Sequence, residues 1–136
     1  MYNHNVDIKK WFYTNLVSAT SLGVYDGIAP DTAGNEYLIL TGRTSSQVQG
    51  KNGYTNTLVF TIDIVTKNAN FGFKDSEAIS NQILAAINSD THITLPTGWN
   101  ASSLSVAGIR NIQALNPLDN VFRTLLTYNL TITQTQ

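Results

Sequence analysis

The side chains that most often perform catalysis or bind metals are few in this sequence and lie far apart along it. The only histidines, His4 and His92, do not lie at metal-ligand spacing from another ligand, and cysteine is absent. The only glutamates are Glu36 and Glu77, and the acidic residues are scattered singly, without a pair for acid–base chemistry. No nucleophile elbow, phosphate-binding loop or dinucleotide fingerprint occurs. We therefore expect no enzyme activity, no cofactor and no metal site, although residues distant in sequence can still converge in space.

The composition indicates a single folded domain with an unusually uncharged surface. The chain has 136 residues, which favours one domain over residues 1–136, and 42% of them are hydrophobic, enough for a substantial core. Only 12% are charged, about half the usual share, and Asn, Thr and Ser take their place. Large protein–protein contacts explain such a surface, because interface cores are depleted of charge. A neutral, threonine-rich β surface explains it equally well.

Charge and hydropathy patterning argue against two broad classes of partner. The net charge is −1 and no basic run occurs, so binding dominated by nucleic-acid phosphates is not expected. No apolar run approaches 18 residues, so no membrane span is predicted. The first residues lack the basic and then apolar pattern of a secretory signal, which together with the absence of cysteine fits synthesis in the cytoplasm.

Two neighbouring elements organise the remainder of the predicted fold. Residues 57–66 alternate strictly, with Leu58, Phe60, Ile62 and Ile64 on one side, which predicts a half-buried strand. Residues 76–88 repeat isoleucines at three- and four-residue steps, which predicts an amphipathic helix. We expect Asp75 or Ser76 to cap this helix and Asn88-Ser89 to end it. A strand and helix of this kind suit a sheet with a helix packed across it.

The remaining segments complete an α+β prediction. A helix with Ile8, Trp11, Phe12 and Leu16 on one side is expected over residues 6–17, and its Trp11 can serve the core or cover a neighbouring subunit. Strands are expected at residues 24–25, 36–41, 102–115 (with a separate short strand at 109–114 as the alternative) and 121–133, the last one central in its sheet. The predicted fold is a mainly antiparallel sheet with the residue 76–88 helix and the N-terminal helix packed on it.

The least apolar segment lies between two of these strands. Residues 44–56 contain Gly50 and Asn52-Gly53, which are hairpin or loop signals, and the segment is longer than a tight hairpin needs. We expect an exposed, mobile arm over about residues 43–56. A solvated loop is one interpretation, and contact with a partner is the other, since loops often carry binding.

Several segments together resemble the tail-terminator, or tail-completion, family of long-tailed bacteriophages, which includes head-to-tail joining proteins. The similarity runs through Val24–Pro30, through Glu36–Gly42 (where Glu36 stands in place of a common proline), and through the strand at Thr57–Thr66. It continues through the helix at Ser76–Asn88 and the closing strand at Phe122–Ile132. These are patterns of apolar spacing that cover nearly the full chain, without an invariant catalytic motif.

The resemblance implies a virion protein without enzymatic activity. A hexameric ring of the chain would cap the tail tube, meet the tail-tube protein and the head–tail connector or neck proteins, and let double-stranded DNA pass through its lumen without specific binding. Such a ring uses a heterologous interface. The expected contacts to neighbours come from the arm, the 71–74 loop and the first helix: Arg43, Gln47, Gln49, Lys51, Tyr54, Phe71, Phe73, Lys74 and Trp11. The alternative is a small β-rich module that binds a ligand or glycan, with Trp99 as a stacking platform.

Overall fold

The computed structural model describes residues 5–50, 53–67, 73–88, 93, 95, 99–113 and 121–134. Within them, the chain forms helix α1 (Asn5–Thr20), strand β1 (Gly23–Asp26), a short 3-10 helix (Asp31–Ala33), strands β2 (Glu36–Gly50) and β3 (Gly53–Thr66), helix α2 (Lys74–Ala86), and strands β4 (Trp99–Gln113) and β5 (Phe122–Gln134). The order of helices and strands is the one predicted from the sequence.

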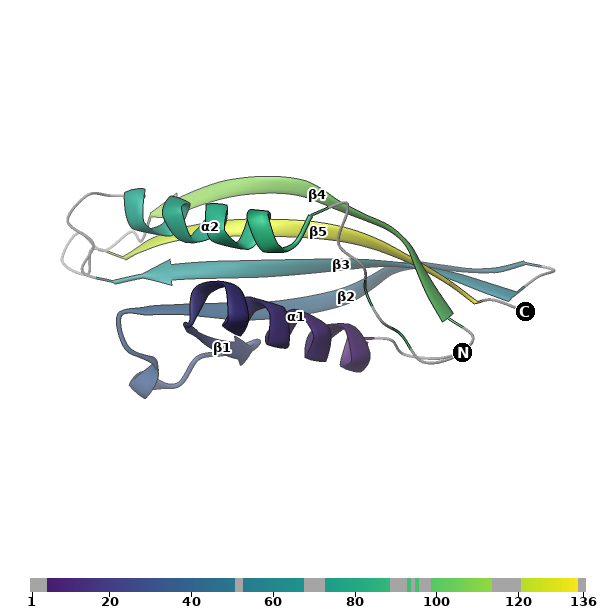
Figure 1. Ribbon diagram of the computed structural model, residues 1–136, viewed down its shortest axis with the longest axis horizontal. Coiled ribbons are helices and arrows are strands. Elements are labelled where there is room, and N and C mark those ends of the chain that lie inside the picture. The colour runs from purple at the N-terminus through teal and green to yellow at the C-terminus, as the bar shows by residue number, and fades with distance from the viewer. Residues whose placement is uncertain are drawn as a thin grey trace.

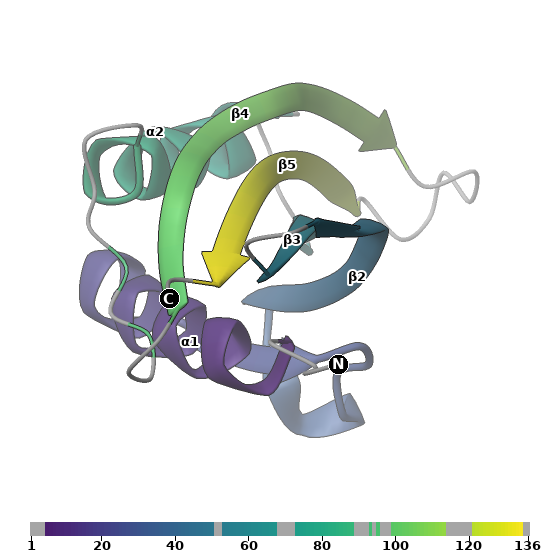
Figure 2. The same cartoon turned by 90° about the vertical axis from the view of Figure 1, so that its right-hand side faces the viewer.

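The strands form one sheet in the order β1-β2-β3-β5-β4. The short β1 runs parallel to β2, and all other neighbours are antiparallel. The prediction of an α+β fold with a mainly antiparallel sheet is therefore confirmed. β5 lies between β3 and β4, which agrees with the central position expected for it. The long strands curve strongly, and both helices lie on the same face of the sheet (Figures 1 and 2).

The core lies between that face and the helices. The alternating residues of β3 are fully buried, as their pattern predicts, and so are the matching residues of β5, including Tyr128. On α1, Ile8, Phe12 and Leu16 recur at helical spacing and are also fully buried. The ring of Phe12 packs 5.1 Å from that of Phe60 and 5.7 Å from that of Tyr128, which fixes α1 over the middle of the sheet.

The segment predicted as an exposed, mobile arm between two strands extends both strands as a hairpin. β2 continues to Gly50, β3 begins at Gly53, and these two glycines are paired. Gly53 of the hairpin signal Asn52-Gly53 is the first residue of β3, whereas Lys51 and Asn52 lie outside the described residues. Serine, threonine and glutamine are compatible with a strand when one side of it faces solvent, so low hydrophobicity alone was insufficient to indicate a loop.

Two further boundaries differ from the sequence prediction. α2 begins at Lys74 with Phe73 as its N-cap, and Ser76 lies inside the first turn, where its Oγ donates to the Phe73 carbonyl at 3.1 Å. The helix also ends earlier than expected, because Ile87 turns to an extended conformation and is fully buried.

β4 is one continuous strand with bulges between Ala101 and Ser103 and between Val106 and Gly108. Its bulges interrupt the alternation, which made it resemble two strands.

Candidate interaction surfaces

The structure brings together no metal-binding cluster within the part of the chain that it describes. No group of three or more His, Asp or Glu side chains gathers there. Glu36 lies on β2, whereas Glu77 lies on α2 and accepts a hydrogen bond from the Asn111 amide at 2.8 Å. Both histidines of the sequence, His4 and His92, are outside the described residues. Among the described helices, none is long and apolar enough to cross a membrane.

The face of the sheet opposite the helices has a threonine-rich surface. Thr61, Thr127 and Asn129 are half-buried or exposed there, and no described helix or strand covers them (Figure 2). One ion pair crosses this face. Asp63 is only 8% exposed, and both of its oxygens accept hydrogen bonds from Nε of Arg123 at 3.1 Å, while Nη2 of Arg123 also contacts Oδ2.

This ion pair is suited to holding strands together. The hydrogen bonds to Asp63 raise the pKa of Arg123, so the guanidinium stays charged and has no proton to exchange in a reaction. The pair joins β3 to β5, and the nearby Tyr37 ring lies 5.3 Å from the Lys67 ammonium, which adds a cation–π contact at the same end of the sheet. We therefore assign this cluster a structural role.

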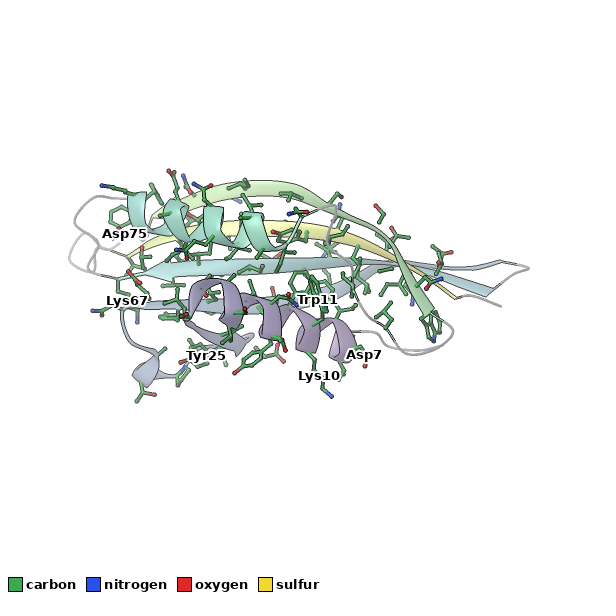
Figure 3. The ribbon with its side chains drawn as sticks, viewed as in Figure 1. Asp7, Lys10, Trp11, Tyr25, Lys67 and Asp75 are labelled. Carbon is green, nitrogen blue, oxygen red and sulfur yellow. The ribbon has the colours of Figure 1, made fainter. Side chains whose placement is uncertain are left out.

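A second surface is a groove between α1 and β1. It encloses about 480 Å³ and is predominantly apolar. Val24 and Leu40 lie at its base on the sheet, with Tyr13 from the helix and Tyr25 from β1 beside them. Figure 3 shows Lys10 and Tyr25 projecting on the same side of α1. An ion pair between Lys9 Nζ and Asp26 Oδ1, 3.0 Å apart, links the helix to the strand. A groove of this kind suits an apolar side chain from another protein.

Among the described residues, those predicted to contact neighbours lie on separate parts of the fold. Arg43 is exposed on β2, and Gln47, Gln49 and Tyr54 also belong to the β2–β3 hairpin, although the structure describes only their backbone. Lys51 and Phe71 lie outside the described residues. Of the predicted contact residues, the fold therefore brings together those on the β2–β3 hairpin.

The other predicted contacts lie elsewhere. The Phe73 ring packs edge-on against Phe122 at 5.1 Å, and Phe122 pairs with Thr66, which is at the opposite end of β3 from the hairpin. Lys74 begins α2 there and is exposed. Trp11 is half-buried against the core beside Phe12, so of its two interpretations the structure favours the core.

Sequence reasoning missed the two open edges of the sheet. β1 pairs only with residues 37–40 of β2, so β2 has no described partner on its outer side from Thr41 to Gly50. β4 is the edge strand on the other side and has no described partner along its outer side. The one available signal was the mismatch in length between a strand ending at Asp26-Gly27 and the much longer hairpin after it. Strand order itself cannot be deduced from the local pattern.

Comparison with known proteins places the fold but not a family. No protein-family model matches the chain, and no curated protein matches it in sequence. A solved chain described as "Virion of native gene transfer agent (GTA) particle" is similar at a TM-score of 0.79, with 17% identity over 98% of this chain and 99% of that chain. A second solved chain, whose description states no function, has a TM-score of 0.58, with 16% identity over 92% and 91% of the two chains. At these identities the likeness is one of fold.

Proposed function

We propose that this chain is a structural protein of a phage-like virion and, more specifically, a subunit of the ring that terminates the tail tube and joins it to the head connector. The observation that carries the proposal is the likeness in fold, at a TM-score of 0.79 and over nearly the whole of both chains, to a chain of a gene transfer agent virion. That likeness supports a structural role in a virion. The place in a tail-terminating ring is supported in addition by the sequence resemblance to tail terminators.

The polar groups of the structure support an assembly role over a catalytic one. The hydroxyl of the buried Thr124 lies 2.8 Å from Ser76 Oγ and 2.9 Å from Asn111 Oδ1, and its one proton is donated to one of these two oxygens at a time. Asp63 and Arg123 likewise occupy each other. Polar side chains so engaged hold α2, β3, β4 and β5 together and leave little reactive capacity. Trp99 packs half-buried against the core, which disfavours its use as a glycan-stacking platform.

In this role the chain's partners are copies of itself in a hexameric ring, the tail-tube protein and the connector or neck proteins. Double-stranded DNA would pass through the lumen, and a conduit should not hold DNA tightly. The net charge of −1 and the absence of basic runs agree with that requirement. The ring would reside in the virion at the junction of tail and head, after synthesis in the host cytoplasm.

The proposal is tested by the oligomeric state of the pure protein and its affinity for tail tubes. Mass photometry and negative-stain imaging should show rings of defined copy number, either in solution or after addition of tail tubes. Unrelated tubes of similar diameter serve as the control for specific capping. A chain that stays monomeric at high concentration and also fails to cap tail tubes would refute the proposed function.

A further inference from the structure

We infer that neighbouring copies join edge to edge, with the outer edge of β4 in one copy pairing with the outer edge of β2 in the next and filling its groove. This inference rests on the proposed ring and specifies how its subunits meet. It follows from the open edges, the strand directions and the position of exposed apolar side chains.

The first part of the interface is the bare edge of β2. The last hydrogen bond from the β1 side runs from the Gly27 N–H to the Leu40 carbonyl at 3.0 Å, and Gly27 has a φ of 77°, which turns the chain away from the sheet. Because backbone groups alternate in direction along a strand, those of Gly42 and Thr44 face outward like those of Leu40. Outward N–H and C=O groups are a template for another strand.

The two edges have suitable directions for pairing. β4 is antiparallel to β5, β5 to β3, and β3 to β2, so β4 runs opposite to β2. Rotation about an axis parallel to the strands leaves every strand direction unchanged. A β4 edge that meets β2 of the next copy is then antiparallel to it. The two edges are different surfaces of one molecule, so the contact is head-to-tail, as a closed ring requires.

Exposed apolar side chains on β4 stand at the level of the groove. Val106 and Ile109 are 40% and 56% exposed. Their partners on β5, Tyr128 and Leu126, are buried beneath the helices, so both side chains lie on the helix-bearing side of the sheet. The strand register places four paired residues side by side in one row across the sheet: Ile109 on β4, Leu126 on β5, Ile62 on β3 and Leu40 on β2.

Leu40 also lines the groove between α1 and β1, on that same side of the sheet. Pairing at equal level would therefore bring Val106 and Ile109 of one copy to the groove of the next. Both side chains would leave water on assembly, which favours the contact. The occupant of the groove is thus a second copy of this chain.

The short β1 limits how far the pairing extends. It covers residues 37–40 of β2, which are level with residues 109–112 of β4. The bulge between Val106 and Gly108 lies where β4 must leave the β2 edge, and bulges bend a strand. The new ladder is therefore expected to run from Trp99 to about Val106, opposite the part of β2 that follows Leu40.

Cysteine cross-linking tests this register, because the chain contains no cysteine. Arg43 and Ser105 are level across the sheet and exposed on its open face, at its two opposite edges. The double variant Arg43→Cys/Ser105→Cys should form an intermolecular disulfide ladder under mild oxidation. The single variants should not extend beyond a dimer, and Thr61→Cys/Ser105→Cys, with one cysteine in the central β3, is the matched control.

The outcomes separate this interface from the proposed function. Rings in which the edge pair cross-links no better than the control pair would overturn the edge-to-edge arrangement and leave the ring protein intact. A chain that forms no ring and caps no tube overturns both. A ladder from the edge pair alone, closing at the copy number of the ring, supports both.

Substitution in the groove contact gives an independent measurement. Ile109→Lys should raise the concentration at which half the protein assembles by at least about tenfold, because a charge would enter an apolar groove. The melting temperature of the monomer should not change, since this side chain is 56% exposed. Ile28→Lys, at a loop residue that is 81% exposed, is the matched control and should assemble normally. Equal assembly of both variants would overturn the inference.

Discussion

Replacing Tyr128 by Phe probes the contact that ties α2 to the sheet. Tyr128 is fully buried on β5, and its hydroxyl donates a hydrogen bond to the Ile87 carbonyl at 2.9 Å, immediately after the end of α2. Burial raises the pKa of Tyr128 to about 12. The substitution keeps the ring that packs against Phe12 and removes only the hydroxyl, so its effect isolates the hydrogen bond and the titrating group.

The expected cost has a neutral-pH part and an alkaline part. Without the hydroxyl, the carbonyl of the buried Ile87 loses its donor, which should cost about 1–3 kcal/mol of unfolding free energy. An ionised Tyr128 is disfavoured in the folded state, so the wild type retains its full stability below the unfolded pKa of about 10 and loses stability as the pH rises toward the folded value of about 12. A difference of roughly two pKa units corresponds to about 2.7 kcal/mol, and Phe cannot ionise.

Urea denaturation from pH 8 to pH 11.5 measures both parts. The wild type should exceed Tyr128→Phe by about 1–3 kcal/mol at pH 8, and the gap should narrow above pH 10. Titration of the other tyrosines and lysines is common to both proteins and cancels in the difference. Tyr13→Phe, at a tyrosine that is 52% exposed, should follow the wild type at every pH. A gap that stays constant to pH 11.5 would refute the assignment of Tyr128 as a buried titrating group.

Two further predictions concern the packing and the ion pair of the sheet. Gly42→Ala should destabilise the protein by about 1–3 kcal/mol, because the new Cβ would lie 2.3 Å from the Phe60 ring. Gly108→Ala is the control and should change stability by less than about 0.5 kcal/mol, because no atom lies within 4 Å of its Cβ position. Equal melting temperatures of the two variants would contradict this prediction. A double-mutant cycle of Asp63→Asn and Arg123→Gln should give a coupling free energy of about 1 kcal/mol. This value is modest because the Arg123 side chain is 39% exposed. A coupling free energy indistinguishable from zero would show that the pair does not hold the strands together.

The parts of the fold that the sequence predicts are those in which one face is buried and the other faces solvent. β3 and α2 are examples, because their apolar residues follow the period of a strand and of a helix without interruption. The strands predicted at residues 36–41 and 57–66 were too short, because the far part of the hairpin carries serine, threonine and glutamine. The start of α2 was misplaced because its N-cap is Phe73, a residue type that rarely caps a helix and that makes no side-chain capping hydrogen bond here.

The candidate surfaces were less predictable than the fold. Exposed polar residues such as Gln47 and Arg43 are natural guesses for a contact, yet their grouping depends on the hairpin. The open edges depend on strand order, and the groove depends on where α1 crosses β1. Each of these is a relation between segments far apart in sequence, so no local pattern contains it.

The composition of the two open edges is consistent with the proposed pairing between copies. Natural edge strands are commonly protected by lysine, inward-pointing charge or proline. β4 spans 15 residues with Arg110 as its single charge and no proline, and the bare part of β2 has Arg43 alone. Bulges protect β4 only in part, and Ile109 remains exposed beside one of them. Two weakly protected edges on one curled sheet invite open-ended polymers unless the curl closes the chain of contacts into a ring. In the proposed ring, edges with few charges would pair without the cost of removing those charges from water.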